Sequence, residues 1–308
     1  MRRPLLSLRE RQYFFGNRAR LLYELLAWGF RNETDVRFMN YGYAGDGPGI
    51  ALPPEEEFER YCAQLYHAVA GQVPLAGKAV LDVGSGRGGG ASYIQRHLGA
   101  AETVGCELAE HAVAFARKVH GAVPGLSFRQ GDATALPFAA ESFDAVVNVE
   151  SAHCYPDRAA FFSEVFRVLK PGGHFLVADF TPPRVAAERA RAEIGEDLAL
   201  AGFGRAEAKD ITPEILRALD LDHDRRSGEI RRRFPLGTRR AAQYWAGTKG
   251  SWIYRDFAEG RRAYLMYRIV KPVIALPALT GRDDAGAPRR VRAAVPDLVP
   301  QSARTLEV

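Results

Sequence analysis

Between residues 57 and 180 the chain alternates short apolar runs with amphipathic segments, and this alternation limits its fold more than any other feature. Apolar runs such as KAVLDVG at 78–84 are typical of strands buried on both faces of a parallel sheet. The amphipathic segments predict helices at 57–71, 88–98, 109–119 and 158–169. Strand, helix and strand in this order predict an α/β fold, a doubly wound and mostly parallel Rossmann-like sheet that binds ligands at the carboxyl ends of its strands.

The alternation ends after Phe180, and the remaining segments are expected to surround the sheet. Thr212, ahead of Pro213, is predicted to N-cap a helix. Residues 7–30 predict an amphipathic helix that packs on the domain or on a second copy, so a homodimer through this helix is one expectation. Its basic polar face leaves a membrane or lipid contact open. The expected organisation is an N-terminal helix and lid segment at 1–56, a core at 57–181, a helical substrate cap at 182–260, an antiparallel closing strand within 261–279 and a mobile tail at 280–308.

Composition and charge make several classes of protein less probable for this chain. The 308 residues are 47% hydrophobic and 26% charged, which is typical of a soluble globular protein. The net charge of +5 is spread along the chain, which favours a solvated surface over a nucleic-acid interface. Three isolated cysteines predict neither a metal site nor a disulfide framework, so a cytoplasmic location is expected. No run approaches the ~20 apolar residues of a transmembrane helix, and the N-terminus lacks a signal-peptide pattern.

A glycine-rich turn directly behind the first apolar run fits two cofactor patterns. Gly84, Gly86 and Gly89 satisfy the dinucleotide pattern, in which glycines let the backbone approach a pyrophosphate. Asp82 and three alternating glycines equally satisfy the pattern for S-adenosylmethionine. Glu107, at the end of the next predicted strand, serves either cofactor because a carboxylate can accept hydrogen bonds from both ribose hydroxyls. The turn alone leaves both cofactors, and a purely structural turn, open.

Segments further along the chain separate these alternatives. GDATALPFAAESFDAVVNVES at 131–151 and VLKPGG at 168–173 follow the turn in order. With them the chain resembles the class I S-adenosylmethionine-dependent methyltransferases. Within this family it is similar to the phthiotriol dimycocerosate methyltransferases and to bacterial fatty-acid and natural-product O-methyltransferases. The likeness runs from about Phe38 to Lys271, and a dehydrogenase would have no reason to carry these segments.

The resemblance implies S-adenosylmethionine as cofactor, S-adenosylhomocysteine as product and a set of binding residues. Asp132 would bind the adenine amino group, Glu107 the ribose, and Gly84 and Gly86 would lie under the methionine part. An aromatic lid over the cofactor is implied for the segment near residue 42. The residues expected to bind the cofactor are Tyr41, Tyr43, Asp82, Gly84, Ser85, Gly86, Glu107, Leu108, Asp132, Ala133, Asn148 and Val149.

The segment ESAHCYPD at 150–157 contains the candidate base. His153 matches the first of two adjacent histidines in related sugar O-methyltransferases, whereas the second is Cys154 here. Asp179 matches an acidic residue near the acceptor and would orient His153 or receive a substrate hydroxyl; capping roles are the alternative for both. A hydroxyl acceptor must lose a proton, which makes His153 a general base. A carboxyl acceptor is already ionised at neutral pH, so His153 would only orient it.

Substrate contacts are expected after the fifth strand and beside the candidate base. They are Glu150, Tyr244, Trp245, Trp252 and Tyr254, although the aromatic residues could equally pack the cap. The basic run EIRRRF at 229–234 could hold an anionic acceptor or form a solvated helix face. The expected function is O-methylation of a lipid-like or polyketide-type small molecule. Carbon methylation of a terpenoid or sterol-like substrate is the alternative, and a non-catalytic S-adenosylmethionine-binding module is a further one.

Overall fold

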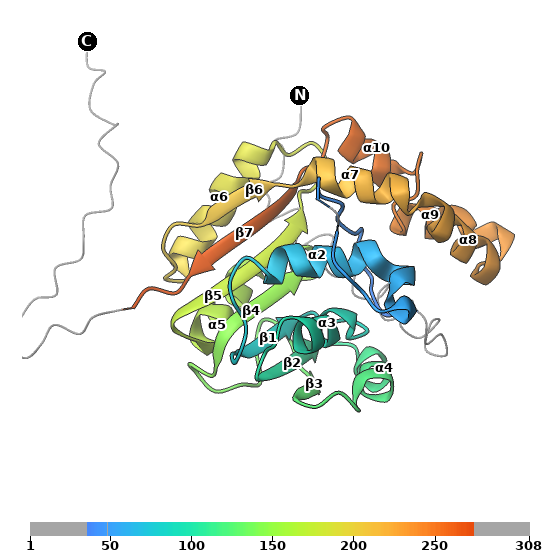
Figure 1. Ribbon diagram of the computed structural model, residues 1–308. Coiled ribbons are helices and arrows are strands. Elements are labelled where there is room, and N and C mark those ends of the chain that lie inside the picture. Colours follow the sequence, from blue (N-terminus) through green and yellow to red (C-terminus); the bar gives the residue numbers. More distant parts are fainter. Residues whose placement is uncertain (1–35, 48, 274–308) are drawn as a thin grey trace, which may run out of the picture. The chain divides into compact units, whose positions relative to one another are not determined.

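The computed structural model describes residues 36–47 and 49–273, which belong to one compact unit that ends at Val273 (Figure 1). The predicted helix at 7–30, the dimer contact assigned to it and the tail at 280–308 lie outside the described residues.

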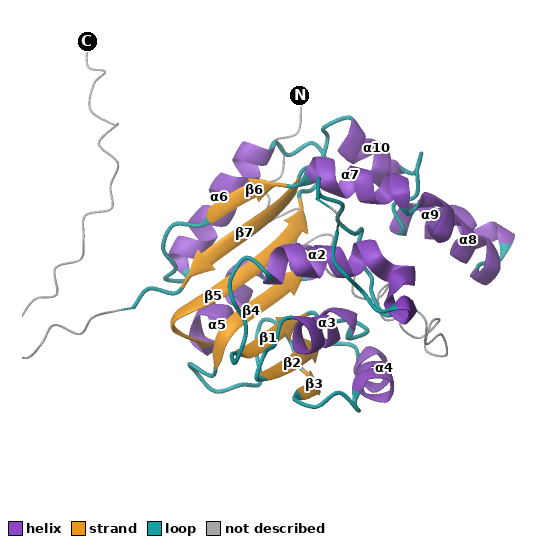
Figure 2. Ribbon diagram, in the orientation of Figure 1, coloured by secondary structure: helices purple, strands orange, loops and turns teal. Residues whose placement is uncertain are grey.

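One sheet of seven strands forms the centre of this unit, in the order β3-β2-β1-β4-β5-β7-β6 (Figure 2). Strands β1 to β5 are parallel, and β7 is antiparallel to both β5 and β6. The predicted Rossmann-like sheet with an antiparallel closing strand is therefore confirmed. The order reverses between β1 and β4, which places a ligand crevice at the carboxyl ends of these strands. The strand bounds are β1 (Ala79–Val83), β2 (Glu102–Glu107), β3 (Leu126–Gln130), β4 (Phe143–Val149), β5 (Leu169–Phe180), β6 (Glu207–Asp210) and β7 (Tyr264–Val270).

Helices cover both faces of the sheet because successive side chains of a strand point to opposite sides. Val147 and Val149 of β4 pack in one apolar cluster with α2, α7 and α10, whereas Val146 packs in a second cluster with α5 and α6. The helix bounds are η1 (Pro54–Glu59), α2 (Arg60–Ala70), α3 (Gly89–His97), α4 (Glu110–His120), η2 (Ala152–Cys154), α5 (Arg158–Val168), α6 (Ala187–Leu200), α7 (Thr212–Leu221), α8 (His223–Arg233), η3 (Leu236–Thr238), α9 (Arg239–Trp245) and α10 (Trp252–Ala258). None of the described helices is long and apolar enough to cross a lipid bilayer.

The segment expected to be a helical cap at 182–260 is more varied than predicted. Helix α6 packs through Ala190 and Leu198 beside α5, so it covers the sheet instead of extending the cap. Strand β6 pairs antiparallel with β7 at the sheet edge. Its sequence, EAKD, is mostly charged and exposed, so no apolar alternation marks it as a strand. Of this segment, α6 and β6 therefore belong to the sheet and its cover, and α7 to α10 are the remaining helices.

The predicted N-cap at Thr212 is wrong by one position. Helix α7 begins at Thr212 itself, and Ile211 precedes it as the capping residue. The Thr212 hydroxyl instead donates to Asp210 Oδ1 at 2.5 Å and accepts the Tyr264 backbone N–H at 2.8 Å. The reason is the short strand β6, which brings the chain directly from the sheet into the helix. The hydroxyl therefore connects β6 with β7.

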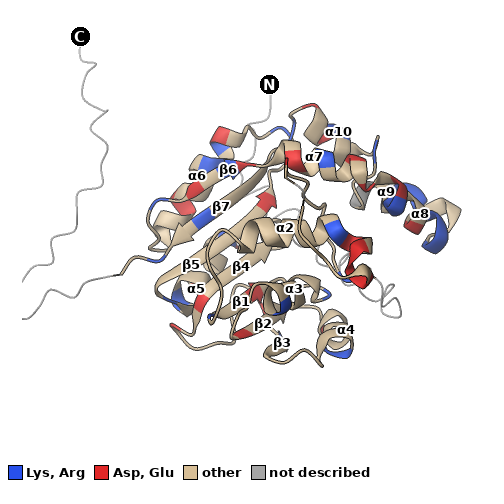
Figure 3. Cartoon of the chain, in the orientation of Figure 1, with Lys and Arg blue, Asp and Glu red and all other residues tan. Residues whose placement is uncertain are grey.

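The basic run at 229–234 forms the last turns of α8 (Figure 3). Glu229 Oε2 lies 2.7 Å from Arg232 Nη2 and 2.5 Å from Arg233 Nε. Pairs at these spacings form on one helix face. The run thus makes ion pairs within its own helix, and it does not line the cavity described next.

Candidate functional site

A cavity lies at the carboxyl ends of β1, β2 and β4, where the strand order reverses. It encloses about 1290 Å³, part of which is open to solvent. Its wall combines the glycine-rich turn, the ends of β2 and β4, the loop after β3 and the segment at 37–40. The predicted site residues in its lining are Gly84, Ser85, Gly86, Glu107, Leu108, Asp132, Ala133, Val149 and Glu150.

The glycines of the turn are required for different reasons. A Cβ atom on Gly84 would lie 2.1 Å from Ser151 Oγ, and one on Gly90 would lie 1.9 Å from the Tyr66 ring. These two glycines allow close packing within the protein. Gly86 has φ +53°, and no atom lies within 4 Å of the position of its missing Cβ. Gly86 is therefore the glycine whose missing side chain leaves room for a ligand in the cavity.

Two carboxylates lie in the cavity wall, Glu107 at the end of β2 and Asp132 in the loop after β3. Glu107 Oε2 accepts the Gly86 N–H at 3.0 Å, and its Oε1 accepts the Ala109 N–H at 2.9 Å. Burial raises the pKa of Glu107 and these backbone donors oppose the rise. Asp132 Oδ1 accepts the Thr134 backbone N–H at 2.8 Å, so this carboxylate also has a fixed orientation. Both can accept further hydrogen bonds, as the hydroxyl and amino groups of a nucleoside require.

An unsatisfied polar atom marks the same wall. Ser85 Oγ is buried and has no hydrogen-bond partner among the described residues. Buried polar atoms of native proteins are usually paired, so an unpaired hydroxyl on a lining residue is compatible with a ligand beside it. Together with the open position at Gly86 and the carboxylates of Glu107 and Asp132, it fits a nucleoside that carries a methionine chain. These residues would hold S-adenosylmethionine.

The segment at 36–44, which we call the strap, forms another part of the wall. The Val36 carbonyl accepts from Arg87 Nε at 2.6 Å, and the Arg37 carbonyl accepts the Gly89 N–H at 3.2 Å. These bonds place the strap against the glycine-rich turn. Sequence reasoning missed the lining residues of the strap, Arg37, Phe38, Met39 and Asn40. Only the aromatic character of Phe38 could have suggested this position.

The two predicted lid tyrosines lie in the strap but outside the cavity lining. The Tyr41 ring packs against Phe180 and Phe257, with centroids 5.7 and 5.9 Å away. The Tyr43 carbonyl accepts from Gln64 Nε2 at 2.8 Å. Both residues therefore fix the strap against the sheet and α2.

Asp82 and Asn148 also lie behind the lining. Asp82 is fully buried, which raises the pKa of its carboxyl to about 8, and Tyr66 donates a long bond of 3.4 Å to it. Asn148 Nδ2 donates to Ser151 Oγ at 2.8 Å and to the Tyr155 hydroxyl at 3.0 Å. Ser151 and Tyr155 line the cavity and were not predicted. Asn148 thus supports the wall from inside the sheet.

His153 and Asp179 form a contact pair at the ends of β4 and β5. The distance from His153 Nδ1 to Asp179 Oδ1 is 2.8 Å, and Asp179 Oδ2 accepts the His153 backbone N–H at 2.8 Å. The Phe180 ring lies 4.3 Å from the imidazole. Burial disfavours the charged ring, but Asp179 and then Cys154 outweigh it and raise the pKa of His153 well above its ordinary value. Neither member lines the cavity, whereas the next residue, Cys154, does.

Glu150 lines the cavity three residues before His153. Its Oε1 accepts the Tyr41 N–H at 2.7 Å and the Tyr264 hydroxyl at 2.9 Å. Burial raises the pKa of this carboxyl to about 7. Its backbone has φ +50°, an unfavourable value for a residue with a Cβ. Both contacts hold the side chain at the cavity wall.

Two of the four predicted aromatic substrate residues, Trp252 and Tyr254, can be placed relative to the cavity. Trp252 is 70% exposed. The Tyr254 hydroxyl donates to Asp220 Oδ1 at 2.8 Å. Neither residue lines the cavity. Tyr244 and Trp245 belong to α9, but their side chains lie outside the described part of the chain.

Known proteins are similar to this chain in sequence. Residues 81–177 match the family model of a methyltransferase domain. The fatty-acid O-methyltransferase of Mycolicibacterium smegmatis is 40% identical over 78% of this chain and 85% of its own. The phthiotriol/phenolphthiotriol dimycocerosates methyltransferase of Mycobacterium tuberculosis is 38% identical over 82% of this chain and 91% of its own.

Solved structures show the same fold at lower identity. The [4+2]-cyclase SpnF has a TM-score of 0.64 at 21% identity, covering 84% of this chain and 96% of its own. Haemonchus contortus phosphoethanolamine N-methyltransferase 2 in complex with S-adenosyl-L-methionine has a TM-score of 0.62 at 20% identity. The match covers 88% of this chain and 61% of its own. A cyclase and a methyltransferase thus share this architecture, so the fold alone does not determine the reaction.

Proposed function

Because this chain belongs to the S-adenosylmethionine-dependent methyltransferases, we propose that it methylates an oxygen atom of a lipid-like or polyketide-type small molecule. The names of two relatives, one acting on fatty acids and one on phthiotriol lipids, support a lipid-like acceptor. The observation that carries the proposal is the pair of His153 and Asp179, which lies next to the lining residue Cys154.

Glu107 and Asp132 would hold the ribose and adenine, while Gly86 leaves room for the methionine chain. S-adenosylmethionine, when bound, would supply a methyl group carried on a positively charged sulfur. After transfer of the methyl group, this sulfur would be a neutral thioether. The protein contributes mainly by holding the acceptor oxygen in line at near-attack distance, which can be worth about 7–11 kcal/mol. Val149 and Glu150 lie where β4 reaches the cavity, so the acceptor would approach from this end.

His153 has a different role for each type of acceptor. Asp179 contacts Nδ1, so a proton exchanged with an acceptor would move at Nε2. The raised pKa favours the protonated form of the imidazole. A protonated ring can pair with a carboxylate and orient it. A hydroxyl acceptor instead requires the neutral ring, which takes the hydroxyl proton as the oxygen–methyl bond forms.

One labelling experiment tests this proposal. Methyl-labelled S-adenosylmethionine would be incubated with fatty acids, hydroxylated lipids and polyketides, and each labelled product would be treated with mild alkali. Label released as methanol identifies a methyl ester and therefore a carboxyl acceptor. Label that survives requires identification of the methylated atom by NMR. An ether supports a hydroxyl acceptor, whereas a new carbon–methyl bond would contradict O-methylation.

A further inference from the structure

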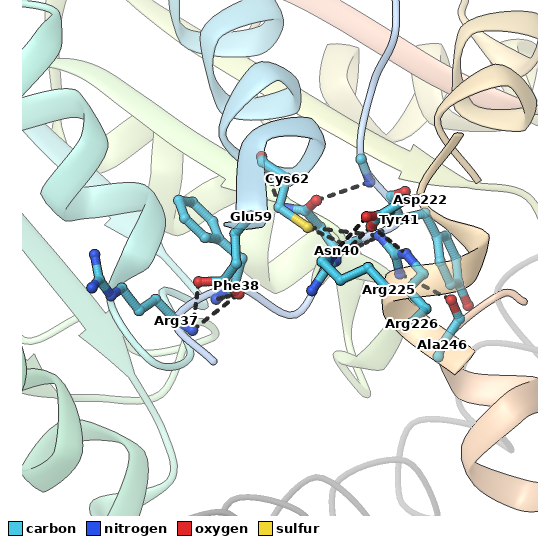
Figure 4. A network of polar contacts seen from close by, with 11 residues as sticks. Arg37, Phe38, Asn40, Tyr41, Glu59, Cys62, Asp222, Arg225, Arg226 and Ala246 are labelled. Atoms are coloured by element: carbon cyan, nitrogen blue, oxygen red, sulfur yellow. Dashed lines mark hydrogen bonds and ion pairs between the residues drawn. The ribbon is translucent and has the colours of Figure 1, made fainter. Parts of the chain in front are cut away.

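A buried arginine of α8 contacts the strap (Figure 4). Arg226 is 8% exposed, and its Nη2 donates to the Asn40 carbonyl at 3.1 Å and to the Tyr41 carbonyl at 3.0 Å. Its Nη1 donates to the Ala246 carbonyl at 2.9 Å. One guanidinium therefore joins α8, the end of α9 and the strap. Asn40 itself lines the cavity.

Asp222 fixes the direction of this guanidinium. Its Oδ2 lies 2.7 Å from Arg226 Nε, and its Oδ1 accepts from Arg225 Nε at 2.6 Å. Asp222 and Arg226 are both buried, so solvent screens their attraction only weakly. A planar guanidinium can make these four contacts at once, whereas a lysine ammonium of similar charge has three donors at a single point.

Cys62 of α2 lies beneath the same contact. Its thiol donates to the Asn40 carbonyl at 3.5 Å, and Arg226 Nη2 lies 3.6 Å from its sulfur. Burial raises the pKa of this thiol to about 12, so it remains neutral and unreactive while the strap is in place. The reactivity of Cys62 therefore reports whether the strap is held.

The strap has two further anchors on the core. Glu59 accepts the backbone N–H groups of Arg37 and Phe38 at 2.9 and 3.1 Å. Glu150 accepts the Tyr41 N–H. Glu59 and Glu150 thus accept hydrogen bonds from backbone N–H groups of the strap, whereas Arg226 donates to two of its backbone carbonyls. The lining residues therefore lie between anchors from α8, the core sheet and the segment before α2.

We propose that Arg226 is a positioning residue for the cofactor, which holds the Asn40–Tyr41 part of the strap in the geometry that S-adenosylmethionine requires. Cofactor affinity then depends on α8, a helix that contributes no lining residue to the cavity. The inference requires cofactor binding alone and not the proposed acceptor. A merely structural arginine would change the stability of the fold and leave cofactor affinity in the folded protein unchanged.

The test compares Arg226→Lys with Arg231→Lys in the full-length chain. Arg231 is an exposed residue of the same helix, so it controls for the chemical change. Calorimetric titration with S-adenosylhomocysteine should show about tenfold weaker binding for Arg226→Lys. In the absence of cofactor, alkylation of Cys62 should be about tenfold faster in the same variant, as measured by mass spectrometry. Arg231→Lys should match the wild type within about twofold.

Kinetics and a second variant make the test decisive. Arg226→Lys should raise the KM for S-adenosylmethionine more than it lowers kcat, because the change removes positioning before the methyl-transfer step. If circular dichroism shows that Arg226→Lys does not fold, Asp222→Asn removes the orienting partner instead and should move both readouts in the same direction. Wild-type S-adenosylhomocysteine affinity and wild-type Cys62 labelling in the folded variant would overturn the proposal. Because no acceptor is used in the binding and labelling measurements, their outcome is separate from that of the O-methylation test.

Discussion

At the scale of single residues, the charge of His153 depends on Asp179, and this charge determines how the enzyme should respond to pH. With a hydroxyl acceptor, kcat/KM should rise as pH increases toward the raised pKa, because only the neutral ring can take the proton. With a carboxyl acceptor the rate should fall over the same interval, because the orienting positive charge is lost. Profiles of kcat/KM from pH 6 to 9 distinguish the two.

Substitution of His153 should separate the same two roles by magnitude. His153→Gln should lower kcat by about 100-fold or more on a hydroxyl acceptor. On a carboxyl acceptor it should chiefly raise the acceptor KM. Steady-state kinetics with a saturating cofactor concentration measures both constants. A loss below about fivefold on a hydroxyl acceptor would contradict the general-base role.

Alanine at two glycines of the turn should have different effects. Gly84→Ala places a methyl group against Ser151 and Tyr155 at a position that also has positive φ, so we expect a lower unfolding temperature than for Gly86→Ala. Gly86→Ala meets no protein atom and should cost about 1–2 kcal/mol for its positive φ. Its methyl group would occupy cavity space, so S-adenosylhomocysteine should bind more weakly. Equal stability of the two variants would contradict this assignment.

At the scale of elements, the Thr212 hydroxyl should stabilise the junction of β6, β7 and α7. Thr212→Ala leaves the Tyr264 N–H without this acceptor and should lower the free energy of unfolding by about 1–2 kcal/mol. Thr212→Ser keeps the hydroxyl and should recover most of that loss. Denaturant unfolding of both variants measures the difference, and an equal loss in the serine variant would show that the hydroxyl is not responsible.

The elements also show how far the sequence predicts the structure. Strands β1 and β4 are predicted because buried parallel strands are nearly continuous apolar runs. Strand β3, LSFRQ, is mostly exposed, so it is predicted only from its place in the alternation of helices and strands. Strand β6 is not, since an exposed edge of charged residues carries no apolar pattern. The lining residues of the strap and the contacts of Arg226 join segments far apart in the chain, and no local pattern encodes such pairs. Gly86 and Glu107 could be identified because their motif is local.

At the scale of the whole molecule, buried carboxyl groups should make stability fall as pH rises. The pKa values of Glu59 and Glu150 are raised to about 7 and that of Asp82 to about 8, chiefly by burial. The folded state therefore retains protons that the unfolded chain releases, and stability is lost as pH rises through these values. Burial lowers the pKa of His120 to about 4, which favours folding as pH rises from 4 to about 6.5.

The two trends place the expected stability maximum on the acidic side of neutrality. Denaturant unfolding at intervals from pH 4 to 9 measures the curve. Glu59→Gln removes one titrating group, so the curve should become flatter between about pH 4.5 and 7, by up to about 1.4 kcal/mol per pH unit. A wild-type curve that rises steadily to pH 9 would contradict the assigned burial effects.

The short strand β6 has a consequence for self-association. Its four residues, Glu207–Asp210, are mostly charged and exposed, and Glu207 pairs across the sheet with Arg268. An edge of this kind resists the addition of a strand from another molecule, because the incoming strand would have to desolvate those charges. The sheet should therefore not continue from one copy into the next along the β6 edge, which leaves β3 as the other edge of the described sheet.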